Sequence, residues 1–441
     1  MKRLNILLVS IILIKLLHLG LYKIFDTTEG RYAGMTFRMA HNNNFLTPYN
    51  LPDQEFLAKP PFAIWIGAIF FKIFGSYHEF VARLPYFLTS ILILFTGFFW
   101  VKKETSKIQA YQFGIIFAST VGFAILSGMV MIDACLLLGT TLTNMGFFYG
   151  LTKKRYGYLF FLGLSISTLS KGLIGIVISG IGCFLFTLIK NKWKDLLNFP
   201  ILGFLMFLLL TLPWFILMEI NHSGFLNYFF IGEHFQRFLI KGWSGDKYGF
   251  AHSEPFFTIL IFFVICSFQW FIYACFICYK NRKQISFKNL SDFNLFTLLN
   301  FIVPLIFFSF SRNIIIPYAT LSLVSFCILI AINYKVNFKT LFYLSIPFSL
   351  IGLVSFTVIA PSVKTSDKIL VQEFNNQNKQ NQQTLYYLQK PDFNAYFYAK
   401  DNITRITNED LKQLSNVFFV SSSKHEERKI ICNKARCLYK K

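Results

Sequence analysis

Charged side chains are scarce in this sequence of 441 residues. Asp, Glu, Lys and Arg make up 15% of the chain, whereas a soluble domain averages roughly a quarter. Acids are the scarcer sign, with 21 Asp and Glu against 43 Lys and Arg. Hydrophobic residues make up 54% of the chain, and 56 residues are Phe. Because the apolar residues recur in long runs, the sequence excludes an ordinary soluble domain and predicts a multi-pass membrane protein.

The sequence also lacks a signal-peptide cleavage site and has few cysteines. No small-x-small cleavage site follows the first apolar run, so we expect this run to remain as a membrane anchor. The chain has only 8 cysteines, and those in apolar segments are expected to be inert packing groups: Cys135, Cys183, Cys266, Cys275, Cys278 and Cys327. The basic excess is explained by cytoplasmic loops and anionic lipid, so no nucleic-acid partner is predicted.

Apolar segments that can cross a bilayer as helices recur along the chain. We predict eleven, at residues 4–24, 80–101, 109–128, 133–151, 157–170, 172–189, 199–219, 256–279, 293–311, 314–332 and 340–361. With the N-terminus inside, alternate loops are short and basic, as cytoplasmic loops are. The basic residues of these loops are Lys102, Lys103, Lys107, Lys153, Lys154, Arg155, Lys190, Lys192, Lys194, Lys280, Arg282, Lys283, Lys288, Lys335 and Lys339. An odd number of spans places residues 362–441 outside.

The opposite side carries two long loops, at about 26–79 and 220–255. Residues 30–41 and 60–74 of the first loop have the amphipathic pattern of helices that lie along the membrane interface. The second could instead be re-entrant or a full span. A full span would turn every later basic loop outward, and the charge pattern argues against that.

Residues 362–441 differ in composition, and we predict that they form a small α/β domain outside the cytoplasm, separate from a membrane domain at 1–361. The run at 372–383 is typical of a linker or a helix start. Residues 384–388, 395–399 and 417–422 are predicted strands, and 408–415 a helix. On a periplasmic face Cys432 and Cys437 can form a disulfide, with two reduced thiols as the alternative.

Three acids lie where apolar runs meet water: Asp26, Glu29 and Asp133. Charges retained near a bilayer usually serve a function. On a helix start Asp26 and Glu29 would share one face. Each of the three acids could instead cap the helix that follows it, since acids favour a helix N-terminus.

Basic residues accompany these acids. Arg31 follows Glu29, and Lys59 precedes two prolines that stiffen the backbone, although it could also be a lysine reaching the headgroups. Lys171 interrupts an apolar stretch in the same way. Residues 227–241 place Glu233, His234 and Arg237 within one helical turn, where a neutral imidazole with carboxylates could hold a divalent metal. The alternative for this segment is an interfacial helix with its polar face in water.

The chain resembles the membrane glycosyltransferases of the protein O-mannosyltransferase and aminoarabinose transferase type. The resemblance rests on an ordered set of motifs between residues 20 and 320: EGRYAGM (29–35), FLTPYN (45–50), AKPPFAIW (58–65), FVARLP (80–85), MIDACLL (131–137), SKGLIG (170–175), LPWF (212–215), NYFFIGEHFQRF (227–238) and FFSFSRNIIIPY (307–318). The resemblance implies an all-α polytopic membrane protein of the GT-C fold, which uses polyprenyl-phosphate sugars and inverts the anomeric centre. Two positions depart from the family pattern. Thr28 replaces the first acid of an Asp-Glu pair, and Ala58 replaces a metal-binding Glu.

The resemblance predicts a glycosyltransferase that moves a sugar from a polyprenyl phosphate to lipid A, a glycolipid, a polymer or a protein on the outer face of a bacterial inner membrane. Its implied site residues are Glu29 or Asp26 as the base, Asp133 as an orienting acid, Lys59, Arg31, Arg237 and Lys171 as phosphate ligands, and His234 as a ligand to a possible divalent metal. The alternative is a transporter or flippase for a lipid-linked saccharide, which would place acids deep in the bundle. Here the acids gather at one interface.

Overall fold

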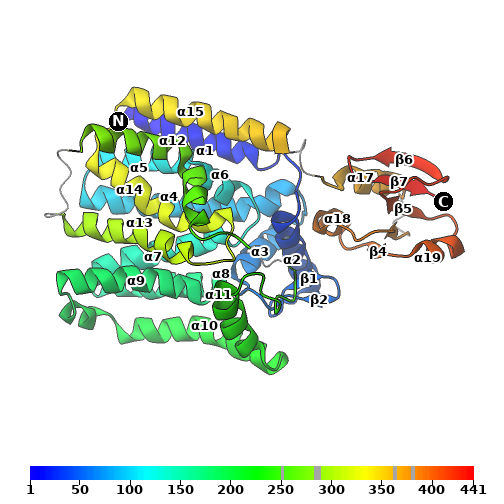
Figure 1. The fold of residues 1–441 in the computed structure, drawn as a ribbon, viewed down its shortest axis with the longest axis horizontal. Helices are drawn as coiled ribbons and strands as arrows, with labels where there is room; N and C mark the ends of the chain where they lie inside the picture. The colour runs from blue at the N-terminus through cyan, green and yellow to red at the C-terminus, as the bar shows by residue number, and fades with distance from the viewer. Residues whose placement is uncertain (250–252, 283–289, 361–364, 379–382) are drawn as a thin grey trace.

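The computed structural model describes residues 1–249, 253–282, 290–360, 365–378 and 383–441. Figure 1 shows a helical bundle with a smaller α/β unit at one end, and the N-terminus lies at the opposite end of the bundle. The predicted division at residue 361 falls outside the described residues, as do Lys283 and Lys288 of one basic loop and 379–382 of the predicted linker, so the domain boundary stays a prediction.

Each of the predicted spans contains a helix. The helices of the bundle are α1 (Lys2–His18), α2 (Thr28–Asn42), α3 (Phe62–Phe74), α4 (Glu79–Glu104), α5 (Lys107–Ser119), α6 (Val121–Gly128), α7 (Asp133–Gly150), α8 (Arg155–Lys171), α9 (Leu173–Lys190), η1 (Lys194–Asn198), α10 (Ile201–Asn221), η2 (Asn227–Gln236), α11 (Arg237–Leu239), α12 (Thr258–Lys280), α13 (Asp292–Ser309), η3 (Ile316–Ser322), α14 (Leu323–Asn333), α15 (Phe338–Val354) and η4 (Ser355–Ile359). Within the described residues, 7 are long and apolar enough to cross a membrane, or up to 8 if α5 and α6, bent by 69°, form one span. A count of eleven crossings therefore remains a prediction, because α1, α7 and α8 fall short of that test.

The two predicted interfacial segments are helical. They form α2 and α3, joined by a short hairpin of β1 (Tyr49–Leu51) and β2 (Gln54–Glu55). The residue after α2, Asn43, and the residue after α3, Gly75, both adopt a left-handed conformation, which ends each helix. Their apolar faces pack on α4 in a cluster that includes Phe37, Phe71 and Tyr86. Residues 26–79, the first of the two long loops predicted to lie on the outer face and named the first outer loop for that reason, thus form a folded layer at the end of the bundle beside the α/β unit (Figure 1).

Helices α7 and α8 pack through glycine. A methyl group at Gly139 would lie 2.5 Å from the backbone nitrogen of Ser167, and one at Gly163 would lie 2.4 Å from that of Thr143. Small residues let helix backbones approach closely where lipid removes the hydrophobic drive for association. The α7–α8 contact fixes Asp133 and Lys171, which lie at adjacent ends of the two helices.

The C-terminal unit contains a five-stranded sheet in the order β4-β3-β5-β7-β6. Its elements are α17 (Lys368–Gln377), β3 (Leu385–Tyr387), α18 (Phe393–Tyr398), β4 (Ile403–Arg405), α19 (Asn408–Gln413), β5 (Phe418–Ser421), β6 (Arg428–Cys432) and β7 (Cys437–Lys440). Strand β3 is parallel to β4 and β5, while β7 is antiparallel to β5 and β6. The predicted strands at 384–388 and 417–422 and the predicted helix at 408–415 are confirmed.

The prediction of a strand at 395–399 is wrong, because this segment forms helix α18. Its aromatic residues suit a strand, yet here the side chains of the segment pack on two different surfaces. Ala395 and Ala399 pack on the sheet of the C-terminal unit, while Phe397 packs into the cluster of the first outer loop. A helical turn lets the segment pack on both surfaces at once, and these tertiary contacts override the local preference for a strand.

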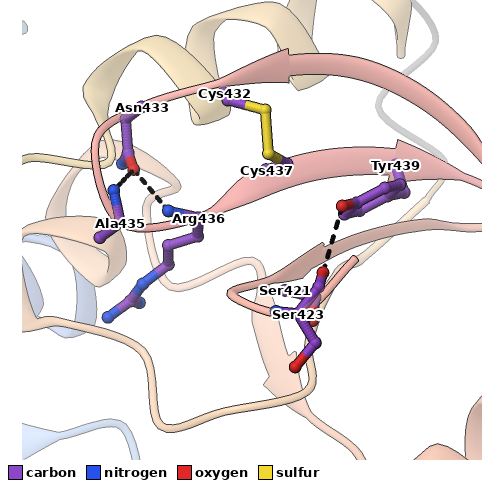
Figure 2. The surroundings of a disulfide bond; sticks show 8 residues. All are labelled: Ser421, Ser423, Cys432, Asn433, Ala435, Arg436, Cys437 and Tyr439. Carbon is purple, nitrogen blue, oxygen red and sulfur yellow. Dashed lines mark hydrogen bonds between the residues drawn. A yellow bond between two sulfur atoms is a disulfide. The ribbon is translucent and has the colours of Figure 1, made fainter. Parts of the chain in front are cut away.

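Cys432 and Cys437 form a disulfide that ties β6 to β7, which selects the first of the two predicted states. Figure 2 shows the bond beside the turn that joins the two strands. In this turn the side-chain oxygen of Asn433 accepts hydrogen bonds from the backbone nitrogens of Ala435 and Arg436, at 2.8 and 2.9 Å. The turn is therefore stabilised both by the disulfide and by the two hydrogen bonds to the Asn433 side chain.

Replacement of Gly163 by Leu is expected to separate α7 from α8 and to lower the melting temperature of the purified protein in detergent, because the added side chain meets backbone rather than a flexible side chain. Gly180→Leu is the matched control, since nothing lies within 4 Å of a methyl group at that position. Melting followed by size-exclusion chromatography measures both. Equal melting of the two variants would contradict the close-packing interpretation.

Candidate functional site

A cavity of about 670 Å³ opens between the first outer loop and the ends of the bundle helices. Seven of the predicted site residues line it: Asp26, Glu29, Arg31, Lys59, Asp133, Lys171 and Arg237. Its other wall is apolar and includes Ile125, Met129, Phe262, Ile316 and Phe356. His234 lies in an adjoining pocket of about 60 Å³, which shares Lys59, Lys171 and Arg237 with the cavity. The structure thus brings all the predicted residues to one place.

Glu29 is paired with Arg83 inside the protein. The Nε and Nη2 atoms of Arg83 donate to its two carboxylate oxygens at 2.7 and 3.1 Å, and both side chains are 0% exposed. Arg83 also donates to the backbone oxygens of Leu19 and Tyr22. Through these bonds α4 holds the segment between α1 and α2, and both oxygens of Glu29 are already engaged.

Asp133 is paired with Lys171 across the α7–α8 contact. The Lys171 Nζ donates to Asp133 Oδ1 at 2.6 Å and lies 3.7 Å from the centre of the Tyr318 ring. In the part of the chain that the structure describes, no hydrogen bond engages Asp133 Oδ2. Asp133 therefore differs from Glu29, because one of its oxygens remains available to a molecule in the cavity.

Lys59 and Arg237 share one carboxylate. Lys59 Nζ donates to Glu233 Oε2 at 2.7 Å, and Arg237 Nη1 donates to both oxygens of Glu233 at 3.1 and 3.0 Å. Burial works against the charge on Glu233, but the two cations outweigh it and lower the pKa of Glu233 below its ordinary value. Burial also lowers the pKa of Lys59, although Glu233 opposes this effect. Asp246 Oδ2 also lies 3.5 Å from Arg237 Nη2, so two cations and two acids form one network at the cavity wall.

Arg31 and Asp26 complete the charged wall. The Arg31 guanidinium is packed among the Tyr32 and Phe56 rings, 5.2 and 5.5 Å from their centres. Asp26 accepts hydrogen bonds from Phe393 and Asn394 of the C-terminal unit. Burial raises the pKa of Asp26 to about 6, although the hydrogen bonds from Asn394 and Phe393 oppose this rise. Its carboxylate is thus engaged away from the cavity it lines.

His234 does not fit the predicted metal. Its Nδ1 lies 2.7 Å from the backbone oxygen of Phe229, and its Nε2 accepts from the backbone nitrogen of Leu173 at 3.1 Å. Burial lowers the pKa of His234, so the ring is neutral with its proton on Nδ1. Both ring nitrogens are then engaged. Among the described residues no group of three His, Cys, Asp or Glu side chains is arranged to hold a metal ion.

Sequence reasoning missed Arg83, which binds the wall residue Glu29, and several residues of the wall itself. Arg83 stands in the motif FVARLP, and a buried arginine in an apolar helix is a signal that could have found it. Tyr318, Asn313, Tyr248, Asp246 and Glu254 also line the cavity. Asp246, Tyr248 and Glu254 follow α11, whereas Asn313 and Tyr318 lie just before η3 and within it. Nothing in the local sequence indicates that these two segments meet.

Three comparisons relate the chain to known proteins. Residues 58–217 match the family described as dolichyl-phosphate-mannose-protein mannosyltransferase. The undecaprenyl phosphate-alpha-4-amino-4-deoxy-L-arabinose arabinosyl transferase of Enterobacter sp. (strain 638) is 24% identical over 315 residues, which cover 70% of this chain and 55% of that protein. The protein of the same name from Shewanella sediminis is 25% identical over 313 residues, with the same shares. The chain thus spans about half the length of the curated relatives it matches.

Solved structures share the fold. The crystal structure of ArnT from Cupriavidus metallidurans bound to undecaprenyl phosphate aligns with a TM-score of 0.80 and 16% identity over 99% of this chain and 97% of that one. The Archaeoglobus fulgidus oligosaccharyltransferase in the apo form aligns with a TM-score of 0.55 and 13% identity over 95% of this chain and 69% of that one. These matches confirm the predicted fold class, and with the sequence relatives they confirm the resemblance to GT-C membrane glycosyltransferases of the aminoarabinose transferase type.

Arg83→Met is expected to destabilise the protein by roughly 3–5 kcal/mol, because it leaves Glu29 buried without a partner. Lys102→Met on the same helix is the control, since Lys102 is exposed. Unfolding in detergent, followed by tryptophan fluorescence, measures the difference. A melting curve of the Arg83 variant that matches the control would show that the pair does not hold the first loop.

Proposed function

We propose that this protein is a glycosyltransferase that moves a sugar from a polyprenyl-phosphate donor to an acceptor in the bacterial envelope, on the outer face of the inner membrane. The observation that carries the proposal is the cavity wall, which combines an apolar side with a basic cluster and acids. A polyprenyl phosphate has the matching chemistry, because its tail is apolar and its head is anionic. The relatives named for undecaprenyl-phosphate arabinose support this substrate class.

The basic cluster accounts for the leaving group. As the bond between the anomeric carbon and the phosphate oxygen breaks, negative charge grows on the phosphate. Lys59 and Arg237 are held in place by Glu233, and Arg237 also by Asp246, so both cations are preorganised at the cavity wall. Lys171 and Arg31 line the same cavity. Preorganised cations of this kind stabilise developing charge without a general acid.

The acid that removes the acceptor's proton must face the cavity with a free oxygen. Glu29 is saturated by Arg83, and the carboxylate of Asp26 is held by Phe393 and Asn394. We therefore assign the base to Asp133, whose Oδ1 is fixed by Lys171 while Oδ2 has no hydrogen bond in the described parts of the chain. The acceptor oxygen attacks the anomeric carbon, its proton passes to Asp133, and polyprenyl phosphate leaves from the opposite face with inversion. No step is assigned to a metal.

The proposal is tested with the purified protein in liposomes that contain a radiolabelled polyprenyl-phosphate sugar and an envelope lipid extract. Label is expected to appear in a new glycolipid or glycopolymer that mass spectrometry identifies, which also names the acceptor. Movement of intact donor across the bilayer, without transfer of label to another molecule, would favour a flippase and refute the proposal.

Asp133→Asn is expected to lower kcat by about 10²–10⁴-fold with little change in the KM for the donor, because a base acts in the transition state. Lys59→Gln is expected to raise the KM for the donor, since it removes a phosphate ligand, and also to lower kcat, since negative charge grows on the phosphate in the transition state. Lys72→Gln is the control, because Lys72 is an exposed lysine of the same outer loop. An Asp133 variant with normal kcat would move the base to another residue.

A further inference from the structure

Asp26 is bound by the C-terminal unit. Its Oδ2 accepts from the backbone nitrogen of Phe393 at 2.6 Å, and its Oδ1 accepts from the backbone nitrogen and side-chain amide of Asn394 at 2.7 and 2.8 Å. In the chain Asp26 directly precedes the cavity-lining residues Thr27, Thr28 and Glu29. Asp26 therefore joins a unit at the end of the chain to the wall of the proposed active site.

The contact is close and shaped by sequence. A methyl group at Gly30 would lie 2.4 Å from Asp26 Oδ1 and 2.8 Å from the backbone nitrogen of Asn394, so only glycine lets α18 approach α2 this closely. Phe397 on α18 is 1% exposed and packs into the apolar cluster of the first outer loop. Figure 1 shows α18 at the edge of the unit that faces α2.

Two further ion pairs fasten the same interface. Arg38 of α2 donates to both oxygens of Asp401 at 2.8 and 2.7 Å, and the Arg38 side chain is 2% exposed. Glu79, which begins α4, pairs with Lys368 and accepts from the Tyr398 hydroxyl. These contacts come from α2 and from the start of α4, so the interface with the C-terminal unit extends beyond Asp26.

The groups that bind Asp26 are themselves held in place within the C-terminal unit. Asn394 is fully buried, and its side-chain oxygen accepts from the backbone nitrogen of Asp367 at 2.8 Å. Arg436, from the turn closed by the disulfide, donates to Asp367 and to Asp392, the residue before α18. A buried polar network within the C-terminal unit thus positions the hydrogen-bond donors that bind Asp26.

We propose that the C-terminal unit is a structural part of the transferase site, and that Asp26 is a positioning residue through which this unit holds residues 26–29 on the cavity wall. The catalytic consequence rests on the proposed function, whereas the docking itself does not. The rival role for Asp26 is the base of the reaction. The two roles predict different effects of replacing Asn394. Because Asn394 does not line the cavity, its replacement lowers activity only if Asp26 acts through its contact with the C-terminal unit.

A double-mutant cycle separates the two roles. Asp26→Ala and Asn394→Ala are each expected to lower kcat by roughly tenfold or more, since small displacements of reacting groups cost up to about 10²-fold. The double variant is expected to be no slower than the slower single variant, because Asp26→Ala already removes the hydrogen bond that the Asn394 side chain donates to Asp26. A catalytic Asp26 would instead lose about 10²–10⁴-fold while Asn394→Ala kept near wild-type activity, and this result would overturn the proposal.

A second measurement does not depend on activity. Amide hydrogen exchange is expected to speed up in residues 24–30 when Asn394 is replaced and in residues 393–398 when Asp26 is replaced. Glu426→Ala is the control, since it removes an exposed carboxylate of the same unit. Unchanged exchange in both segments would refute docking. If the wild-type protein transfers no sugar, the proposed function fails, but the exchange data still decide whether Asp26 holds the C-terminal unit.

Discussion

The Glu29–Arg83 pair fixes the part of the molecule on which the cavity depends. Both side chains are fully buried, and Arg83 uses its remaining donors on backbone oxygens between α1 and α2. A buried pair of this kind contributes little net stability against an apolar replacement, but loss of one partner is costly. Its value is therefore geometric, because it fixes where the first outer loop leaves the bundle and where Asp26 and Glu29 lie.

Charge balance organises the rest of the wall. The carboxylates of Asp133, Glu233 and Asp246 are each paired with a cation of the wall. A low-dielectric cavity strengthens these pairs. The small pocket beside His234 is lined by three of the cations, Lys59, Lys171 and Arg237, and by the acid Glu233. The apolar wall opposite suits a lipid chain, so both halves of one substrate class meet in one cavity.

Much of the architecture was predictable because its signals are local. Each predicted span coincides with a helix, since an apolar run of helical length has few other structures available in a membrane. The residues at 384–388, 408–415 and 417–422 also form the predicted elements. The strand prediction for 395–399 was wrong because these residues pack on two surfaces, the sheet and the first outer loop. Only the sheet belongs to their own unit.

The sequence by itself determined the class of protein, the set of charged residues at one interface and the family they resemble, because hydropathy, charge and motif order are properties of the chain. Tertiary structure alone decided how each charge is used. Glu29 and Asp133 look alike in sequence, yet Arg83 saturates one of them while Lys171 leaves an oxygen of the other open. Asp26 meets a partner 368 positions away in Asn394. Such pairings depend on long-range packing, and no local pattern encodes them.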